Sequence, residues 1–102
     1  MFVIITTCAP KDAQSLLKKL LEQRVVACGN IMPTIRSLYW WKGSIQNDEE
    51  AFLFMETSGE RVQEALESIK ELHPYDVPKI LALEPSKVNQ AYLEWLTQET
   101  QK

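Results

Sequence analysis

Residues 37–43 read Ser-Leu-Tyr-Trp-Trp-Lys-Gly, and this stretch decides how the middle of the chain folds. Lys42-Gly43 is typical of a tight hairpin turn, because glycine readily adopts the positive φ that such turns need. Residues 25–41 before the turn are predicted to be extended, and the return strand is predicted from about residue 48 to residue 57. Each arm is far longer than the roughly five or six residues of an ordinary strand. The sequence therefore predicts an unusually long β-hairpin.

A bend is expected within the first arm of this hairpin. Gly29 and Pro33 interrupt it. Its apolar residues change phase, from odd positions such as Ile35 to even positions such as Leu38 and Trp40. Because side chains alternate between the two faces of a strand, such a change indicates a β-bulge or bend.

The chain before the hairpin predicts a strand and a helix. Phe2–Cys8 is continuously apolar or β-branched, which is typical of a strand that is buried on both faces. Pro10 then favours a helix start. Apolar residues follow with helical spacing, at Ala13, Leu16, Leu17, Leu20 and Leu21.

The chain after the hairpin predicts a second helix, a strand and a third helix. Ser58-Gly59-Glu60 is expected to supply the N-cap of the second helix, and Pro74 to end it. Residues 78–83 form the predicted last strand. The apolar residues of the second helix are Val62, Ala65, Leu66, Ile69 and Leu72, and those of the third are Val88, Tyr92, Trp95 and Leu96.

This order predicts an α+β fold of ferredoxin-like βαββαβ type, with an extended hairpin between the second and third strands and a C-terminal helix. Right-handed crossovers place the first strand between the third and fourth, with the second strand at an edge. A chain of 102 residues is long enough for one core, so residues 1–102 are predicted to form a single domain.

Composition narrows the possible partners and locations. The formal net charge is -3, so no basic face for nucleic acid is expected. No stretch is long and apolar enough for a membrane span, and no secretory signal is visible, so a cytoplasmic location is expected. Cys8 and Cys28 lack a CxxC spacing, which favours free thiols in a reducing compartment.

Tyr39, Trp40 and Trp41 at the hairpin tip indicate self-association. An arm that overhangs a small core has little to bury against, and an exposed apolar arm is a liability unless a partner covers it. The alternative is that the arm folds back over its own sheet. Association through the arm is the favoured interpretation.

Four motifs in order carry a family resemblance: Ala27-Cys28-Gly29-Asn30, the 37–43 stretch, His73-Pro74-Tyr75-Asp76-Val77-Pro78 and Tyr92-Leu93-Glu94-Trp95-Leu96. Together they resemble the CutA family of divalent-cation tolerance proteins. The resemblance implies a homotrimer joined through its long hairpins. It also implies a cytoplasmic role linked to copper and other divalent cations, and no established catalytic activity.

Three positions depart from the family pattern. Gly29 stands where a branched apolar residue is usual, which predicts a looser strand. Glu56 replaces the usual Lys and Lys79 replaces the usual Glu, so the two signs are exchanged. If Glu56 and Lys79 meet across subunits, the exchange preserves an ion pair.

Topology favours a metal site at one end of the sheet. Cys8 and His73 are expected at the end where the first strand finishes, with Asp76 nearby, whereas Cys28 is expected at the other end. A thiolate and an imidazole suit copper or zinc, and the family's proposed metal site draws on similar residues. The alternative is that Cys8 is a small buried hydrophobe and that His73 caps a helix.

Other functional readings are weaker. Asp48-Glu49-Glu50 is interpreted as a solvated charge run. His73 is the only histidine and no Gly-rich phosphate loop is present, so no enzyme is predicted. Three functions stay open: a copper-binding CutA-type trimer, a PII-like trimer that senses a small anion between subunits, and a purely structural or partner-binding trimer.

Overall fold

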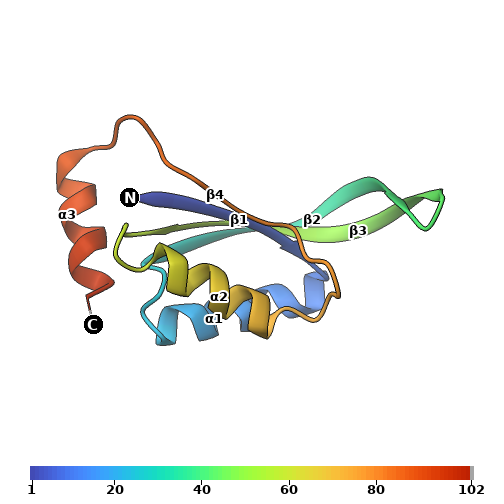
Figure 1. The fold of residues 1–102 in the computed structure, drawn as a ribbon, viewed down its shortest axis with the longest axis horizontal. Coiled ribbons are helices and arrows are strands. Elements are labelled where there is room, and N and C mark those ends of the chain that lie inside the picture. Colours follow the sequence, from blue (N-terminus) through green and yellow to red (C-terminus); the bar gives the residue numbers. More distant parts are fainter. Residues whose placement is uncertain (102) are drawn as a thin grey trace.

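The computed structural model describes residues 1–101 and has the predicted α+β architecture. Helices α1 and α2 cover one face of a four-stranded sheet, α3 lies at one end, and the β2–β3 hairpin projects from the other end (Figure 1). In chain order the elements are β1 Phe2–Cys8, the short 3-10 helix η1 Pro10–Asp12, α1 Ala13–Glu22, β2 Cys28–Trp41, β3 Ser44–Thr57, α2 Val62–Leu72, β4 Ile80–Leu83 and α3 Gln90–Glu99.

The sheet has the strand order β2-β3-β1-β4, and every neighbouring pair is antiparallel, as the crossover rule predicted. The core lies between this sheet and the two covering helices. Leu53 and Met55 of β3 are fully buried there, together with Leu20 of α1 and Ile69 of α2. Burial of such side chains stabilises a fold by about 1.5–3 kcal/mol each.

The predicted hairpin turn at Lys42-Gly43 is confirmed, since both residues have positive φ, 50° and 83°. The return strand is longer than predicted. It begins at Ser44, and not near Asp48, because its first residues pair directly with the end of β2. The sequence does not indicate this part of β3, because residues 44–47 lie at an exposed tip and show no alternation of apolar and polar residues.

The hairpin has two parts that differ in support. In the embedded half, residues 28–32 and 51–57, β3 pairs with both β2 and β1. Strand β1 ends at Cys8, opposite Ala51, so residues 35–50 extend past the sheet and are called the arm. A register shift between Met32 and Ile35 marks the junction, so the predicted bulge is present, but it lies before Ile35 and not between Ile35 and Leu38.

Two terminal details differ from the sequence expectation. The N-cap of α2 is Arg61, without a side-chain capping bond. Ser58 instead accepts a hydrogen bond of 3.0 Å from the hydroxyl of Thr100, which holds the end of α3. Val88 lies outside α3, because Asn89 caps that helix by accepting the amide N–H of Ala91.

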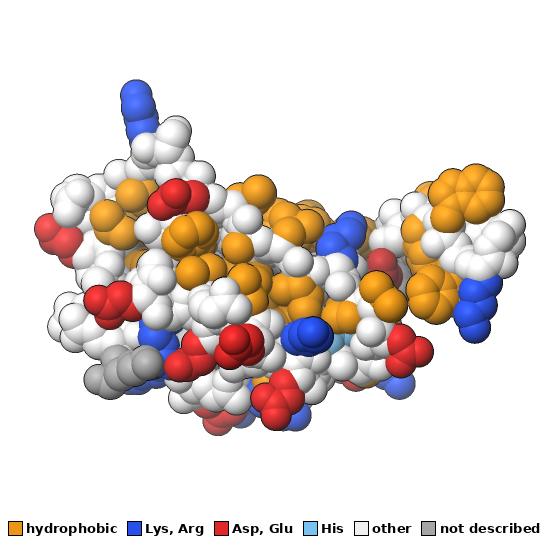
Figure 2. Space-filling model, viewed as in Figure 1, with side chains coloured by type: hydrophobic (Ala, Val, Ile, Leu, Met, Phe, Trp, Pro, Cys, Tyr) orange, Lys and Arg blue, Asp and Glu red, His pale blue; other side chains and the backbone are white. Residues whose placement is uncertain are grey.

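The sheet face away from α1 and α2 is largely uncovered. The interpretation of β1 as buried on both faces is wrong for the single chain, because its open-face residues Val3 and Ile5 are half-buried. Hydrophobic side chains gather in a band above the helices and again at the arm tip (Figure 2). The exposed members of this uncovered face are Met32, Phe54, Leu81 and Leu83.

Gly29 does not loosen its strand in the way the sequence suggested. It pairs with Met55 inside the ladder, and a Cβ at this position would collide with both methyl groups of Leu17 in α1. Leu17 therefore occupies the space that a larger residue at position 29 would need.

Candidate functional site

Cys8 and His73 lie at the same end of the sheet, where β1 finishes and the arm begins, as the topology predicted. Cys8 is the last residue of β1. His73 follows α2 directly and contacts the carbonyl of Thr7, the neighbour of Cys8. Cys28 pairs with Glu56, which pairs with Val3, so the second thiol lies at the opposite end.

Both ring nitrogens of His73 are engaged. Nε2 lies 2.8 Å from the carbonyl oxygen of Thr7, and the backbone N–H of Tyr75 donates to Nδ1 at 3.2 Å. A carbonyl only accepts and an amide N–H only donates, so Nε2 carries the proton and Nδ1 supplies its lone pair to Tyr75. Neither nitrogen is available to a metal ion while these bonds hold.

The Cys8 thiol is buried and protonated at neutral pH. Its side chain is 0% exposed. Burial, and then the nearby carboxylates of Asp12 and Glu50, raises the pKa of Cys8 from 9.0 to about 11. Metals bind the thiolate, so a metal at Cys8 would have to displace this proton. His73 thus contacts the residue next to Cys8, but Cys8 and His73 do not form a preformed copper site.

Glu50 and Tyr75 are functional candidates that the sequence interpretation missed. Glu50 is only 8% exposed, so treating all of 48–50 as a solvated charge run was wrong for this residue. The Tyr75 hydroxyl donates to Glu50 at 2.9 Å, and the Tyr75 ring lies 4.7 Å from that of His73. Burial, and then the bond to Glu50, raises the pKa of Tyr75.

A second tyrosine and carboxylate pair lies farther out on the arm. The hydroxyl of Tyr39 donates to Asp48, and this bond raises the pKa of Tyr39. Asp48 and Glu50 are two residues apart in β3, so they lie on the same face of the hairpin. The remaining member of the charge run, Glu49, is exposed and pairs with Arg36 at 3.5 Å.

The opposite end of the sheet holds a polar cluster beneath α3. Burial, and then hydrogen bonding with Glu56, raises the pKa of Tyr92, and the nearby Cys28 adds to the shift. Glu56 pairs with Val3, whereas Lys79 directly precedes Ile80, which pairs with Thr6. Since a strand rises about 3.3 Å per residue, Glu56 and Lys79 do not meet within one chain.

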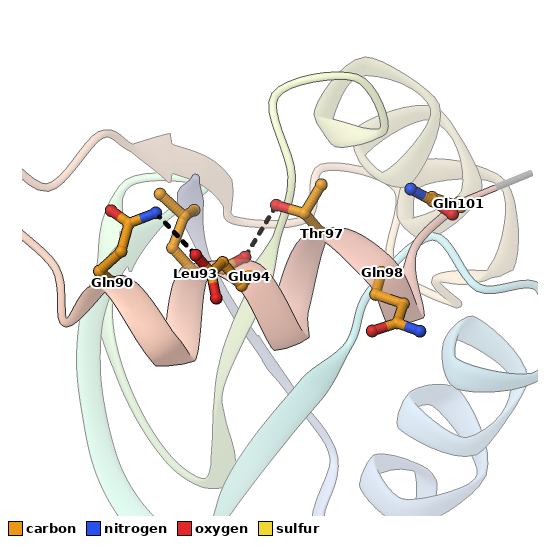
Figure 3. Close-up of a pocket in the computed structure, with 6 residues that line it drawn as sticks. All are labelled: Gln90, Leu93, Glu94, Thr97, Gln98 and Gln101. Carbon is orange, nitrogen blue, oxygen red and sulfur yellow. Dashed lines mark hydrogen bonds between the residues drawn. The ribbon is translucent and has the colours of Figure 1, made fainter.

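Surface hollows and ligand clusters add no further site. Among residues 1–101, no group of three or more His, Cys, Asp or Glu side chains could hold a metal ion. A shallow hollow runs along α3 (Figure 3). All its lining residues come from this one segment, and two of them, Gln90 and Glu94, bond to each other at 3.4 Å. It is an open helix surface and not an enclosed pocket.

The aromatic residues of the arm tip are exposed in the single chain. Tyr39 is 41% exposed, Trp40 71% and Trp41 44%, so the alternative in which the arm folds back over its own sheet is wrong. Over the described part of the chain, no helix is long and apolar enough to cross a membrane.

Comparisons with known proteins agree over nearly the whole chain. The family model described as "CutA1 divalent ion tolerance protein" matches residues 1–99. A divalent-cation tolerance protein CutA from Pyrococcus horikoshii is 41% identical over 103 residues, with all of both chains covered. A crystal structure of CutA1 from the same species has a TM-score of 0.94, with all of both chains covered.

Two more distant structures have the same fold. A PII-like protein CutA from Nostoc sp. PCC 7120, in apo form, has a TM-score of 0.94 at 28% identity and covers 99% of this chain and 98% of its own. A periplasmic divalent cation tolerance protein CutA from Archaeoglobus fulgidus has a TM-score of 0.91 at 31% identity, over 99% and 100% of the two chains.

Proposed function

The chain belongs to the CutA1 divalent ion tolerance family, and from that premise we propose that it works as a homotrimeric divalent-cation tolerance protein that binds copper. The observation that supports assembly is the combination of an uncovered apolar sheet face with an exposed aromatic arm. Large exposed apolar surfaces of this kind mark interaction sites. The tolerance role rests on the family, several of whose relatives are named divalent-cation tolerance proteins.

The two bare sheet edges suit pairing between copies. Strands β2 and β4 are the edges, and the antiparallel pairings make them run in opposite directions. When the next copy is rotated about an axis along the strands, its β4 therefore meets β2 in antiparallel orientation. A closed set of copies would leave no edge bare.

Sedimentation equilibrium tests the assembly. Wild-type protein is expected as a trimer. The double variant Trp40→Ala/Trp41→Ala should raise the dissociation constant by about a hundredfold or more, since buried aromatics dominate interface energies. Trp95→Ala is the matched control, because Trp95 is 42% exposed but belongs to α3. A monomeric wild type, or equal dissociation of the double variant and the control, would overturn assembly through the arm.

Copper binding at Cys8 and His73 is the finer part of the proposal, and it carries a structural requirement. One of the two hydrogen bonds of the His73 ring, to Thr7 or to Tyr75, must break so that a nitrogen becomes free. The Cys8 thiol must also lose its proton. Binding should therefore release protons and strengthen as pH rises. A metal that binds elsewhere on the chain would not need either change.

Calorimetric titration of Cu(II) and Cu(I) tests this site. Binding by the wild type should be lost in a Cys8→Ala/His73→Ala double variant that is still trimeric, and retained in Cys28→Ala. The heat should also vary with the ionisation enthalpy of the buffer, as proton release requires. Equal binding by the wild type and the double variant, or no binding by either, would reject Cys8 and His73 as the copper ligands.

A second candidate is a PII-like trimer that senses a small anion between subunits. The likeness to the PII-like protein CutA of Nostoc favours it. The Lys79 side chain forms no ion pair among residues 1–101, and it is the cation we assign to such a cleft. A thermal shift with a panel of phosphate and nucleotide anions, lost in Lys79→Gln, would support this reading over copper. A structural or partner-binding trimer is the outcome if neither ligand binds.

We propose a cytoplasmic location, on the grounds of the two free thiols. The Archaeoglobus relative is named as periplasmic, so location can differ within the family. Fractionation of cells that express the full chain would distinguish the two.

A further inference from the structure

The strand pairing of the arm is weakest at the point where the arm leaves the sheet. Strand β1 ends opposite Ala51, so Glu50 is the first residue of β3 that β1 does not support. At the same level, Pro33 and Thr34 lie within the register shift of β2. Proline has no N–H to donate, and a bulge leaves its extra residue unpaired and bends the strand.

A chain of hydrogen bonds crosses this junction from the rigid part of the molecule. The Thr7 carbonyl at the end of β1 accepts from His73 Nε2 at 2.8 Å. Nδ1 of the same ring accepts the N–H of Tyr75 at 3.2 Å. The Tyr75 hydroxyl then donates to Glu50 at 2.9 Å. These hydrogen bonds therefore link the end of β1 to the first unsupported residue of the arm through two side chains of the 73–79 loop, His73 and Tyr75.

Burial increases the energetic weight of the last of these hydrogen bonds, from Tyr75 to Glu50. Glu50 is 8% exposed and His73 is 7% exposed, although both lie where an exposed arm begins. A buried carboxylate that loses its hydrogen-bond donor pays the full free-energy cost of desolvation. The conformation in which Tyr75 donates to Glu50 is therefore strongly favoured. Hydrogen bonds to charged acceptors are also stronger and more directional than neutral ones.

We propose that the Tyr75–Glu50 hydrogen bond fixes the direction in which the arm leaves the sheet, and so presents the arm to a second copy of the chain. Tyr75 is then a positioning residue for assembly, which acts without belonging to the aromatic tip. Farther out on the same face of the arm, the hydrogen bond between Tyr39 and Asp48 joins β2 to β3. This inference rests on the proposed arm-mediated assembly.

The experiment compares association with stability in single-atom variants. Tyr75→Phe removes only the hydroxyl, and it should raise the dissociation constant of the oligomer by about tenfold or more, which corresponds to 1.4 kcal/mol per tenfold. Glu50→Gln keeps an acceptor oxygen for Tyr75 and should stay much closer to the wild type. Hydrogen exchange should rise at the amides of residues 35–50 in Tyr75→Phe, because that segment loses its fixed direction.

Thr57→Val is the matched control. It removes a buried hydroxyl that donates to the Val25 carbonyl at 2.6 Å, at the far end of β3 from the arm. It should lower the stability of the fold without selectively changing association or exchange in the arm. If Tyr75→Phe lowers association no more than Thr57→Val, or if Glu50→Gln weakens association as much as Tyr75→Phe, the positioning role is overturned.

These outcomes are separable from failure of the proposed function. A monomeric wild type removes arm-mediated assembly itself, and the positioning role with it. A trimeric wild type whose Tyr75→Phe variant associates equally well removes only the positioning role. A Tyr75→Phe protein that does not fold would be replaced by Glu50→Leu, which removes the acceptor and should give the same loss of association.

Discussion

The two halves of the β2–β3 hairpin share the same strands and the same alternation of side chains, yet they have opposite environments. In the embedded half, Leu53 is fully buried between β1, β2 and the helices. In the arm, Leu38 is 65% exposed and Trp40 71% exposed. Strands β2 and β3 pair in both halves, but β1 pairs with β3 only in the embedded half, and the core under the helices is confined to that half. Strand pairing alone therefore does not determine burial, which depends on what packs against each face.

The two halves of the β2–β3 hairpin therefore differ in what their apolar side chains contribute. The embedded half stabilises the fold, because its apolar residues belong to the core. The arm carries large apolar side chains that lie outside this core and stay exposed, and the proposed assembly would bury them against another copy. Substitutions in the two halves should therefore be measured by different quantities, namely unfolding for the first and association for the second.

The sharpest test of the comparison exchanges the same residue type in each half. Leu53→Ala should lower the free energy of unfolding by about 2–5 kcal/mol, as for other buried leucines. Leu38→Ala should change it by less than about 0.5 kcal/mol. Both are measured by denaturant unfolding in the Trp40→Ala/Trp41→Ala background, so that association adds to neither value. Equal losses would show that the arm is part of the core after all.

The two glycines of the hairpin give a smaller, more local contrast. Gly29→Ala should cost about 1–3 kcal/mol of global stability, because the added methyl collides with Leu17. Leu17→Val should relieve part of that loss. Gly43→Ala meets no atom within 4 Å but keeps a φ of 83°, so its cost of about 1 kcal/mol arises from backbone strain.

Amide exchange distinguishes the two glycine effects. In Gly43→Ala, faster exchange should be confined to the turn and the neighbouring arm, whereas Gly29→Ala should speed exchange throughout the core. Gly43→Asn is the control, because asparagine tolerates positive φ. Global destabilisation by Gly43→Ala would contradict the separation of the two halves.

An effect that appears only at high pH is expected at the boundary residue Cys8. Its pKa is raised to about 11 in the folded protein from 9.0. Above pH 9 the unfolded chain releases this proton and the folded chain retains it, so stability is complete below pH 9 and falls as pH rises toward 11. The loss should be on the order of 1–2 kcal/mol.

Unfolding curves at several pH values between 8 and 11 check this effect. Cys8→Ala should show a shallower decline than the wild type, and Cys28→Ala controls for removal of a thiol. Tyrosine ionisation adds a decline above pH 10, common to all three proteins. A wild type and a Cys8→Ala variant with the same slope would show that the Cys8 thiol ionises as easily folded as unfolded.

Much of the fold could be predicted from the sequence. The limits of β1 and the turn at Gly43 each followed from a local pattern that the structure confirms, and the presence of a bulge in β2 was predicted, although not its position before Ile35. The failures occurred where no such pattern exists. The start of β3 at Ser44 is polar, and Ser58 resembles an N-cap but serves Thr100, which is 42 positions away in the chain.

The candidate site was predictable in its location and not in its chemistry. Topology placed Cys8 and His73 at one end of the sheet, and the structure brings His73 next to the neighbour of Cys8. The bonds that occupy both His73 nitrogens go to backbone groups, which leave no signal in residue identity. The burial of Glu50 could not be predicted for a related reason, because the identity of an acidic residue does not show whether its side chain is buried or solvated.

The complementary edges β2 and β4 have a consequence for copy number. They are two different surfaces, so pairing one with the other has no built-in stopping point. Such an interface closes only when the rotation between neighbours is a whole fraction of a turn, and otherwise it extends into a helical filament. A small error in the rotation between copies would therefore turn a finite particle into a growing polymer. In the proposed assembly, solubility at high concentration would depend on this angle as well as on the affinity between copies.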